Sequence, residues 1–450
     1  MGNVVVYRAG SGTGDLLSTG NPVFLDEFSP TGTLVQSVAL PTTASGNNNP
    51  LIASGTATSE GLLNRSVNGR FLLPTGYGTT IPAASSLPGT AGTAVPRIIG
   101  TVDGNATIDT STALSDFASG NNPRSAASLD GTGLYGTGGA GGVRFAANTS
   151  APTPTTSTQV SSTVANLRNV NIFGGQLFVS TSSGSTVRIG TVGSGTPTTA
   201  GQTITNLPGF PVTGSPYQFI LLDLIPNVGF TPAGGTNTGL DTLYVADDSP
   251  GTIQKYRFDG TNFVVGGTAT FAGARGLTGY ATAGNVTLFV TTGASTAAGG
   301  GTLATLTDAA AATSTLSGAP TNIATAAPNT AFRGVALAPI APTAASWRGG
   351  KALAAGKGVV VSWKAGREAD NLGFDVLRAR KASALRVKVT RKLITGSALS
   401  GAGGNTGAYR FRDRRGKPGD KYFVVSRATD GTKKVHGPLV ARSSTRKASR

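Results

Sequence analysis

Five arginines stand at the start of short segments that recur along the chain, and their spacing suggests that they could act together. These five residues are Arg65, Arg124, Arg168, Arg275 and Arg333. Each of the first four is followed by a glycine-marked turn and then by a segment rich in Leu, Phe, Tyr and Val. A guanidinium group binds oxyanions through paired hydrogen bonds, but it also satisfies backbone carbonyls. We therefore expect either an anion site or a set of structural links, and the structural role is favoured.

Other reactive side chains are sparse. The chain has no cysteine, so it contains no disulfide, thiolate metal site or cysteine nucleophile. The lone histidine, His436, lies near the end of the last predicted strand, where a surface role is favoured over a role as catalytic base. One histidine and no cysteine leave little for a transition-metal site, so we expect no metal and no cofactor.

Two adjacent acidic pairs, Asp26-Glu27 and Asp247-Asp248, are the remaining candidates for acid chemistry. Neighbouring residues of a strand face opposite sides, so neither pair converges on a substrate by itself. We expect Asp247 to stabilise a turn through its carboxylate rather than to bind calcium or act as an acid. The glycine-rich run at 133–142 is not followed by a helix, which predicts a β-turn region rather than a phosphate loop.

Charge divides the chain into two parts. Residues 1–340 hold 12 basic and 14 acidic residues, a net charge of −2, and residues 341–450 hold 25 and 6, a net charge of +19. The break predicts a nearly neutral domain followed by a strongly cationic one.

The first 340 residues predict an all-β ring. They read as repeated four-stranded units of short apolar strands separated by Gly and Pro turns. The chain opens at Val4–Arg8 with the second strand of such a unit, and Phe332–Ala338 supplies the missing first strand. An array whose last strand completes its first unit is a closed ring, so we predict a six-bladed β-propeller over residues 1–340.

In such a ring the five arginines open the innermost strands, which line the central channel. The fifth unit alone carries Gln218 instead. We therefore expect the five guanidinium groups to surround one mouth of the channel.

The fifth unit also carries a family resemblance. Leu243-Tyr-Val-Ala-Asp247 followed by Thr252-Ile-Gln-Lys-Tyr256 resembles the NHL-type propeller repeat. The resemblance implies the architecture and no particular function.

Residues 341–442 resemble a fibronectin type III-like β-sandwich. Trp363 matches the early-strand tryptophan of that family, and Pro418, Gly419 and Tyr422 match its Pro-Gly-x-x-Tyr corner. The resemblance implies that the Tyr422 hydroxyl binds nearby backbone. The linker is expected at Ile340–Ala345, an insertion at Gly401–Gly407, and a disordered basic tail at 443–450.

The order of a propeller and then a module containing Asn371–Val376 and His436–Pro438 resembles secreted bacterial surface proteins. That implies an extracellular or cell-surface location, and we expect that a signal peptide has been removed before Val4. No stretch is long and apolar enough to span a bilayer.

We therefore predict a non-enzymatic binding or structural protein. Its propeller face would bind a ligand or partner, and its basic module would contact anionic polysaccharide, the cell envelope or an acidic protein surface. Specific nucleic-acid binding is not expected, because the arginines are not interleaved with aromatic residues. Two alternatives stay open, a propeller-type glycan lyase or hydrolase and a β-solenoid adhesin.

Overall fold

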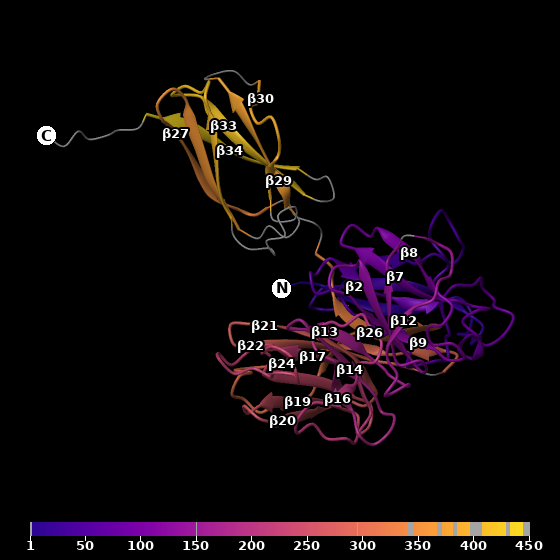
Figure 1. Cartoon of the computed structure of the whole chain (residues 1–450). Helices are drawn as coiled ribbons and strands as arrows, with labels where there is room; N and C mark the ends of the chain where they lie inside the picture. Colours follow the sequence, from indigo (N-terminus) through magenta and orange to yellow (C-terminus); the bar gives the residue numbers. More distant parts are fainter. Residues whose placement is uncertain are drawn as a thin grey trace. The chain divides into compact units, whose positions relative to one another are not determined.

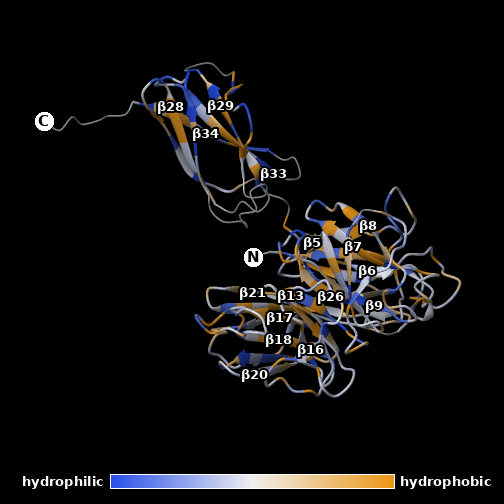
Figure 2. Cartoon of the chain, viewed as in Figure 1, coloured by the Kyte–Doolittle hydropathy of each residue, from blue (hydrophilic) through white to orange (hydrophobic). Residues whose placement is uncertain are grey.

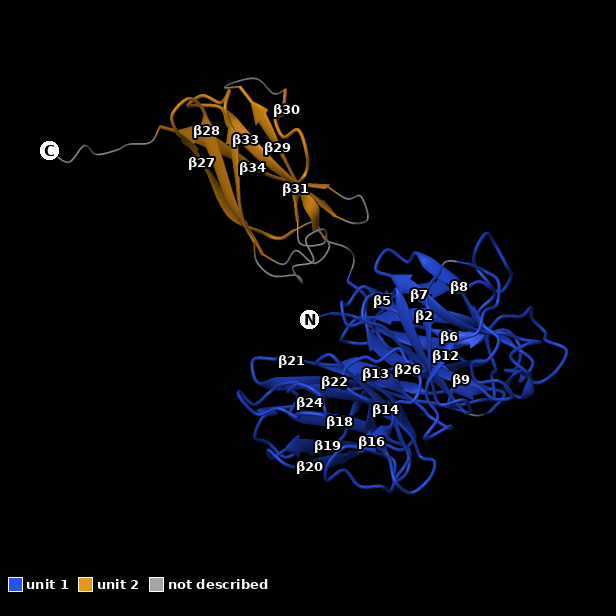
Figure 3. Cartoon of the chain, viewed as in Figure 1, with its two compact units in different colours: residues 1–340 blue, residues 341–450 orange. Residues whose placement is uncertain are grey.

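The computed structural model describes residues 2–149, 151–294, 296–340, 345–366, 371–380, 385–396, 407–428 and 433–443. The chain divides into two compact units, residues 1–340 (unit 1) and residues 341–450 (unit 2), coloured separately in Figure 3. The regular structure of the described residues is β-strand, apart from one 3-10 turn, Leu87–Gly89.

The two ends of unit 1 meet in one sheet. Strand β1 (Val4–Ala9) lies between β26 (Thr330–Leu337) and β2 (Asn21–Phe28), antiparallel to both, and β3 (Leu34–Ala39) pairs with the other edge of β2. Figure 1 labels β2 and β26, the two strands that flank β1. In this register Val5 stands opposite Ala336 and Val6 opposite Val335. The predicted closure of the ring by the two ends of unit 1 is therefore confirmed.

The next part of unit 1 is joined to this sheet through a short strand pair. β4 (Ile52–Ala53) pairs with β2 and with β6 (Thr75–Tyr77). β6 in turn pairs with β7 (Arg97–Asp103). β7 also pairs with β5 (Phe71–Leu72) and with β8 (Ile108–Leu114). The innermost segment, residues 62–65, forms no named strand, and its β-pairing consists of isolated bridges, from Leu62 to Ser125 and from Arg65 to Leu72.

The rest of unit 1 consists of four separate four-stranded antiparallel sheets. The first contains β9 (Pro123–Ala127), β10 (Gly133–Gly138), β11 (Val143–Ala147) and β12 (Thr158–Ser161). The second contains β13 (Val170–Phe173), β14 (Gln176–Ser180), β15 (Ile189–Val192) and β16 (Ile204–Asn206). The third contains β17 (Pro216–Leu222), β18 (Thr242–Asp247), β19 (Thr252–Phe258) and β20 (Phe263–Thr270). The fourth contains β21 (Ala274–Thr282), β22 (Asn285–Thr292), β24 (Thr302–Asp308) and β25 (Thr321–Thr325), and the short β23 (Gly299–Gly300) pairs with β26.

Side-chain alternation along β1 explains how these sheets stack. Val5 and Tyr7 pack with the sheet that follows in the chain, around Leu63 and Ile98. Val4 and Val6 point the other way and pack with the last sheet of unit 1. Opposite faces of one strand thus bury apolar residues against two different neighbours.

The same pattern continues around unit 1. Each of the main apolar clusters is shared by two consecutive sheets, and the last cluster joins the final sheet to the first. This is a propeller-type arrangement, in which no single sheet could bury its apolar faces alone. A β-solenoid, whose strands stack along an axis, is contradicted by the pairing of β1 with β26.

Unit 2 contains eight strands in its described residues. β27 (Trp347–Ala354), β28 (Val359–Ala365) and β32 (Ala408–Asp413) form one run. β29 (Asn371–Ala379), β33 (Lys421–Ala428) and β34 (Lys433–Arg442) form another, with β30 (Val387–Lys388) and β31 (Ile394–Thr395) paired to β29. A short parallel contact, Ala352 opposite Ala441, joins β27 to β34.

The core of unit 2 lies between these two runs. Val361 and Trp363 of β28 pack with Phe374 of β29 and with Tyr422 and Val424 of β33. Figure 2 shows the hydrophobic character of β28. Most of the predicted linker (341–344), insertion (401–406) and tail (444–450) lies outside the described residues.

Candidate functional site

Four of the five predicted arginines lie at one level of the propeller channel. The Gly334 amide donates to the Gly61 carbonyl, and the Leu62 amide donates to the Arg124 carbonyl, both at 2.9 Å. Arg333, Gly61 and Arg124 are therefore level with one another. The inner strands approach so closely here that a Cβ on Gly334 would lie 2.2 Å from the Leu63 nitrogen.

Arg168 and Arg275 share the aromatic ring of Tyr217. The guanidinium carbon of Arg168 lies 3.8 Å from the ring centroid, and that of Arg275 lies 4.9 Å from it. Tyr217 comes from β17, the inner strand that lacks an arginine, and directly precedes Gln218. A cation over a buried aromatic face is a favourable contact, so Tyr217 takes the place of the missing arginine in this layer.

These guanidinium groups connect neighbouring sheets. Arg124 donates to the Leu167 carbonyl at 2.9 Å and Arg168 to the Ser215 carbonyl at 3.3 Å. Arg333, which is 3% exposed, donates to the carbonyls of Gly55 (2.8 Å) and Ala294 (2.9 Å). Arg275 forms an ion pair with Asp248 at 2.9 Å. These are the contacts that a structural role requires, because each acceptor lies in a connecting segment outside the strand that carries or follows its arginine.

Several nitrogens of this layer have no hydrogen-bond partner. They are Nε and Nη1 of Arg275 and Nε of Arg124, and all three are closed off from solvent. An anion could reach them only after the layer rearranged. Burial lowers the pKa of Arg124 and of Arg333 to about 10, so both remain charged at neutral pH.

Arg65 does not belong to this layer, so the expectation that all five arginines surround one mouth was wrong for this residue. It stands three residues beyond Leu62 on its inner segment and donates to the Ala338 carbonyl at 2.9 Å. Its position lines a cavity on the other side of the channel. The repeat predicts that Arg65 opens its inner segment, but Arg65 lies at the end of that segment. Arg124, Arg168 and Arg275 lie at or before the start of β9, β13 and β21, and Arg333 lies within β26.

Glu60 is a buried carboxyl beside the arginine layer that the sequence analysis missed. It is 3% exposed and accepts hydrogen bonds from the Tyr77 hydroxyl (2.6 Å) and the Ser54 amide (3.0 Å). Burial raises its pKa to about 7, although Tyr77 and Arg333 oppose this rise. The sequence did contain a signal for this residue. Glu60 comes directly before the inner segment 62–65, which has no arginine at the level of the other four.

A layer of amide side chains fills the channel beneath the arginines. Asn64 donates to the Ala126 and Val170 carbonyls at 2.9 and 2.8 Å, and Gln218 donates to the Leu63 carbonyl at 2.6 Å. The two meet at 3.3 Å, with Gln218 donating to the Asn64 oxygen. Because these residues come from inner strands on different sides of the ring, they close the channel across its width.

A cavity of about 310 Å³ lies on the far side of this amide layer. Its lining is mainly apolar, with Leu63, Phe173, Ile220, Leu277 and Val335. Asn64 and Gln218 also line it, as does Thr278 of β21. Such a cavity suits a small ligand with an apolar body and one polar end.

The predicted acidic pairs are engaged in local structure. Asp247 accepts from the amides of Ser215 (2.7 Å) and Ser249 (3.1 Å), which confirms its predicted turn-stabilising role. Asp26 pairs with Arg8 at 2.5 Å. Glu27 accepts from Gln36 and from Asn3, both at 2.6 Å.

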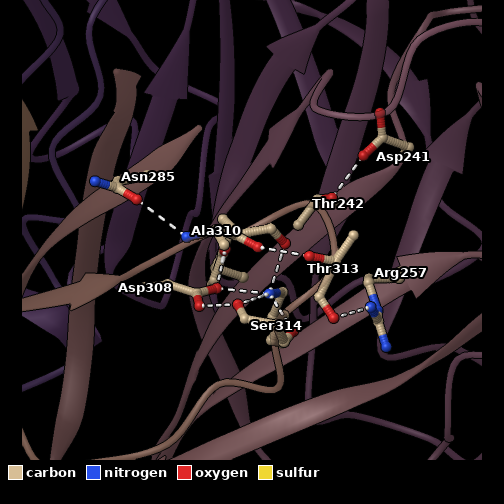
Figure 4. A network of polar contacts seen from close by, with 11 residues as sticks. Asp241, Thr242, Arg257, Asn285, Asp308, Ala310, Thr313 and Ser314 are labelled. Carbon is tan, nitrogen blue, oxygen red and sulfur yellow. Dashed lines mark hydrogen bonds and ion pairs between the residues drawn. The ribbon is translucent and has the colours of Figure 1, made fainter. Parts of the chain in front are cut away.

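Unit 1 also buries its single lysine, Lys255. The ammonium group is 0% exposed and contacts Asp308 at 2.6 Å, the Ala311 carbonyl at 2.7 Å and the Ser314 carbonyl at 2.9 Å. Asp308 also accepts from the Ser314 hydroxyl at 2.6 Å, and Figure 4 shows this network. All three acceptors come from residues 308–314, so the network fixes that connection against β19.

Two expectations for unit 2 were wrong. His436 is not a surface residue: it is 7% exposed, stacks on Trp347 with ring centroids 4.7 Å apart, and lies 3.2 Å from the Ser426 hydroxyl. Burial lowers its pKa. The Tyr422 hydroxyl donates to the Asp413 carboxylate at 2.8 Å rather than to backbone, because Asp413 at the end of β32 comes within reach.

The other two members of the predicted corner form a turn. Gly419, with φ of +86°, follows Pro418, and the Asp420 amide donates to the Lys417 carbonyl at 3.1 Å. Trp363 packs in the core of unit 2, where its ring lies 5.4 Å from that of Phe374.

Several exposed cations of unit 2 line a groove of about 810 Å³. One wall is β30 with residues 389–391, and the other is the end of β32 with the following residues 414 and 415. We call this feature the basic groove. Its charged lining residues are Arg378, Lys388, Arg391, Arg412, Asp413, Arg414 and Arg415.

Comparisons with known proteins add no family. No family model matches the chain, and no curated protein matches it. Among solved structures, a putative 6-phosphogluconolactonase from Bacteroides uniformis covers 90% of this chain and 99% of its own length, at 13% identity and a TM-score of 0.37. The Cps50 (Swd1) β-propeller domain of Myceliophteria thermophila covers 84% and 96%, at 10% identity and a TM-score of 0.33. Similarities this low carry no argument about activity.

Within the described residues, no group of three or more His, Asp and Glu side chains is placed to hold a metal ion. No helix among them has the length and apolar character needed to cross a membrane.

Proposed function

We propose that this chain is a non-enzymatic binding protein of the cell surface. In this proposal unit 2 holds the protein to anionic material, and unit 1 presents one end of its channel to a ligand or partner. The fold that goes with it is a six-bladed propeller with NHL-like repeats, followed by a fibronectin type III-like sandwich. The shared core between the two strand runs of unit 2 supports the sandwich.

One observation carries the proposal: the cations of unit 2 exceed the carboxylates available to neutralise them. The unit has 25 basic and 6 acidic residues. Its described carboxylates are Asp375, Asp413 and Asp420, all buried and all within ion-pair distance of arginine or lysine. These three carboxylates are therefore neutralised within unit 2, and other arginines stay exposed at its surface. A surface with this excess of positive charge attracts polyanions.

The cavity below the amide layer supports the second half of the proposal. It is hollow, mainly apolar and bounded by amides, whereas the guanidinium groups at the other end are already bonded to carbonyls. We therefore assign ligand presentation in unit 1 to the cavity end of the channel.

Among the described residues, Glu60 is the group that most favours an enzyme, because a carboxyl with a pKa of about 7 suits proton transfer. Its burial argues against that role, since Glu60 is 3% exposed and its partner Tyr77 is 0% exposed. A lyase or hydrolase needs its acid in contact with the polymer chain.

The proposal is tested by binding of the full chain to immobilised dextran sulfate and polygalacturonate, with neutral dextran as the control. We expect binding at about 0.05 M salt that weakens by roughly tenfold or more at about 0.5 M salt, because screening shortens the reach of exposed charges. Both polymers should be recovered at their original length. Affinity that does not respond to salt, or equal affinity for neutral dextran, contradicts the proposal, and shortened polymer favours the enzyme.

A further inference from the structure

We propose that the basic groove of unit 2 is a specific binding site for a linear acidic polysaccharide. This inference rests on the proposed function and deepens it. The proposed function requires positive charge on unit 2 as a whole. The groove assigns the contact to one place formed by two separated stretches of the chain.

The groove is built by pairing that brings residues 387–391 and 411–415 to the same side of unit 2. Leu377 and Arg378 of β29 pair with Lys388 and Val387 of β30. Arg378 then reaches Asp413, at the end of β32, with a separation of 2.6 Å. This ion pair lies at the base of the groove, because Arg378 and Asp413 are 11% and 7% exposed.

Among the described residues, three arginines above this base, Arg391, Arg414 and Arg415, have no carboxylate partner. Asp413 is already used by Arg378 and by the Tyr422 hydroxyl. Asp375 is shared by Lys388 at 2.8 Å and Arg427 at 2.6 Å. In the described part of unit 2, the exposed guanidinium groups of Arg391, Arg414 and Arg415 form no ion pair and no side-chain hydrogen bond.

Placing several unneutralised guanidinium groups around one hollow is unfavourable without an anion, because like charges repel. An anion that spans the groove attracts all of these guanidinium groups and offsets the repulsion between them. Carboxylate and sulfate groups both accept paired N–H bonds from a guanidinium group, and a linear polymer presents them in series. The groove has on its two walls three guanidinium groups without an ion-pair partner among the described residues, and it matches such a series better than a single small anion.

The lining also separates polysaccharide from single-stranded nucleic acid. Nucleic-acid grooves combine positive charge with exposed aromatic rings on which bases stack. Among the described residues that line this groove, the one aromatic residue is Phe411, and it packs against the core of unit 2. The groove therefore offers charge without a stacking surface, which favours a chain of sugars over a chain of bases.

The test compares two triple variants of the full chain with equal loss of charge. The groove variant is Arg391→Gln, Arg414→Gln and Arg415→Gln. The control variant is Arg348→Gln, Lys351→Gln and Lys364→Gln, three exposed cations that line a different hollow, beside Trp363 and Tyr409. Each protein is titrated with dextran sulfate, polygalacturonate and single-stranded DNA, and unfolding followed by tryptophan fluorescence checks that unit 2 is intact.

We expect the groove variant to lose roughly tenfold or more in affinity for at least one of the two polysaccharides, and the control variant less than about threefold. The polymer that responds identifies the anionic group, sulfate or carboxylate. Equal losses in both variants overturn the groove and leave the proposed function intact. Failure of the unaltered chain to bind either polymer overturns both. Tighter binding of single-stranded DNA than of both polysaccharides overturns the choice of ligand.

Discussion

The cations of the two units are used in opposite ways. In unit 1, Lys255 and Arg333 are buried, and their donors are taken by a carboxylate or by backbone carbonyls. In unit 2, Arg391, Arg414 and Arg415 are exposed on a groove and have no carboxylate partner among the described residues. The same residue type therefore builds the fold in one unit and is left available at the surface of the other.

The difference teaches that spacing alone does not identify a binding residue. The regular arginines of unit 1 suggest a ring-shaped site, yet four of them donate to backbone carbonyls of connecting segments and Arg275 pairs with the Asp248 carboxylate. A buried cation must have acceptors in place, since losing them leaves a desolvated charge. An exposed cation has no such requirement, and its cluster is retained at some cost in repulsion. Substitutions that act on stability in one unit and on binding in the other test this comparison.

The largest effect is expected for Lys255→Met. The substitution preserves the length of the side chain but leaves the Asp308 carboxylate buried without its cation. Breaking a buried ion pair in this way costs about 3–5 kcal/mol. Urea unfolding of unit 1 followed by tyrosine fluorescence and circular dichroism measures it.

The matched control is Lys364→Met, an exposed lysine of β28, for which we expect a change within about 0.5 kcal/mol. Both tryptophans, Trp347 and Trp363, belong to unit 2, so tryptophan fluorescence reports that unit separately. The double variant Lys255→Met, Asp308→Asn should recover part of the loss. Similar losses for Lys255→Met and Lys364→Met would remove the contrast between the units.

A smaller effect, dependent on pH, is expected at Glu60 beside the arginine layer. Its folded pKa of about 7 lies above the unfolded value of 4.5. The contribution of Glu60 to stability is therefore complete below pH 4.5 and is lost as the pH rises through 7. The shift corresponds to about 3 kcal/mol.

The substitution Glu60→Gln removes this titration. The unfolding free energy of the variant, relative to that of the original chain, should rise by about 3 kcal/mol between pH 4.5 and pH 8. Urea unfolding of unit 1 at both pH values measures it. Parallel pH profiles for the two proteins would show that folding does not raise the pKa of Glu60.

Much of the fold of unit 1 could be predicted from sequence because its ends carry complementary apolar strands. Val4–Ala9 and Thr330–Leu337 are apolar on both faces, as a strand between two stacked sheets must be. The amide layer could not be predicted in the same way. Asn64 and Gln218 are separated by 154 positions, and their contact depends on the size of the ring.

The candidate sites show the same limit. Composition alone places the positive charge in unit 2, because 25 of its 110 residues are basic. It could not locate the groove, which depends on β29 bringing β30 and the end of β32 together. Nor did it predict the burial of His436, because the stacked Trp347 is 89 positions away in sequence.

The smallest effect on stability is expected for the groove itself. The substitutions Arg391→Gln, Arg414→Gln and Arg415→Gln remove no ion pair among the described residues, so the unfolding free energy of unit 2 should change by less than about 0.5 kcal/mol. Any change should be a gain that is greater at low salt, because three like charges are relieved. Urea unfolding followed by tryptophan fluorescence at two salt concentrations measures it.

The contrasting variant is Arg378→Gln at the base of the same groove. It removes the donor that lies 2.6 Å from the buried Asp413 carboxylate and should cost about 1.5–3 kcal/mol. Both sets of substitutions remove positive charge from the same groove, so a difference between them reflects position and not charge. We expect the base residue Arg378 to stabilise the fold and the wall arginines to bind the ligand. If the three wall arginines cost as much as Arg378, they are structural like the arginines of unit 1, and the difference between the units disappears.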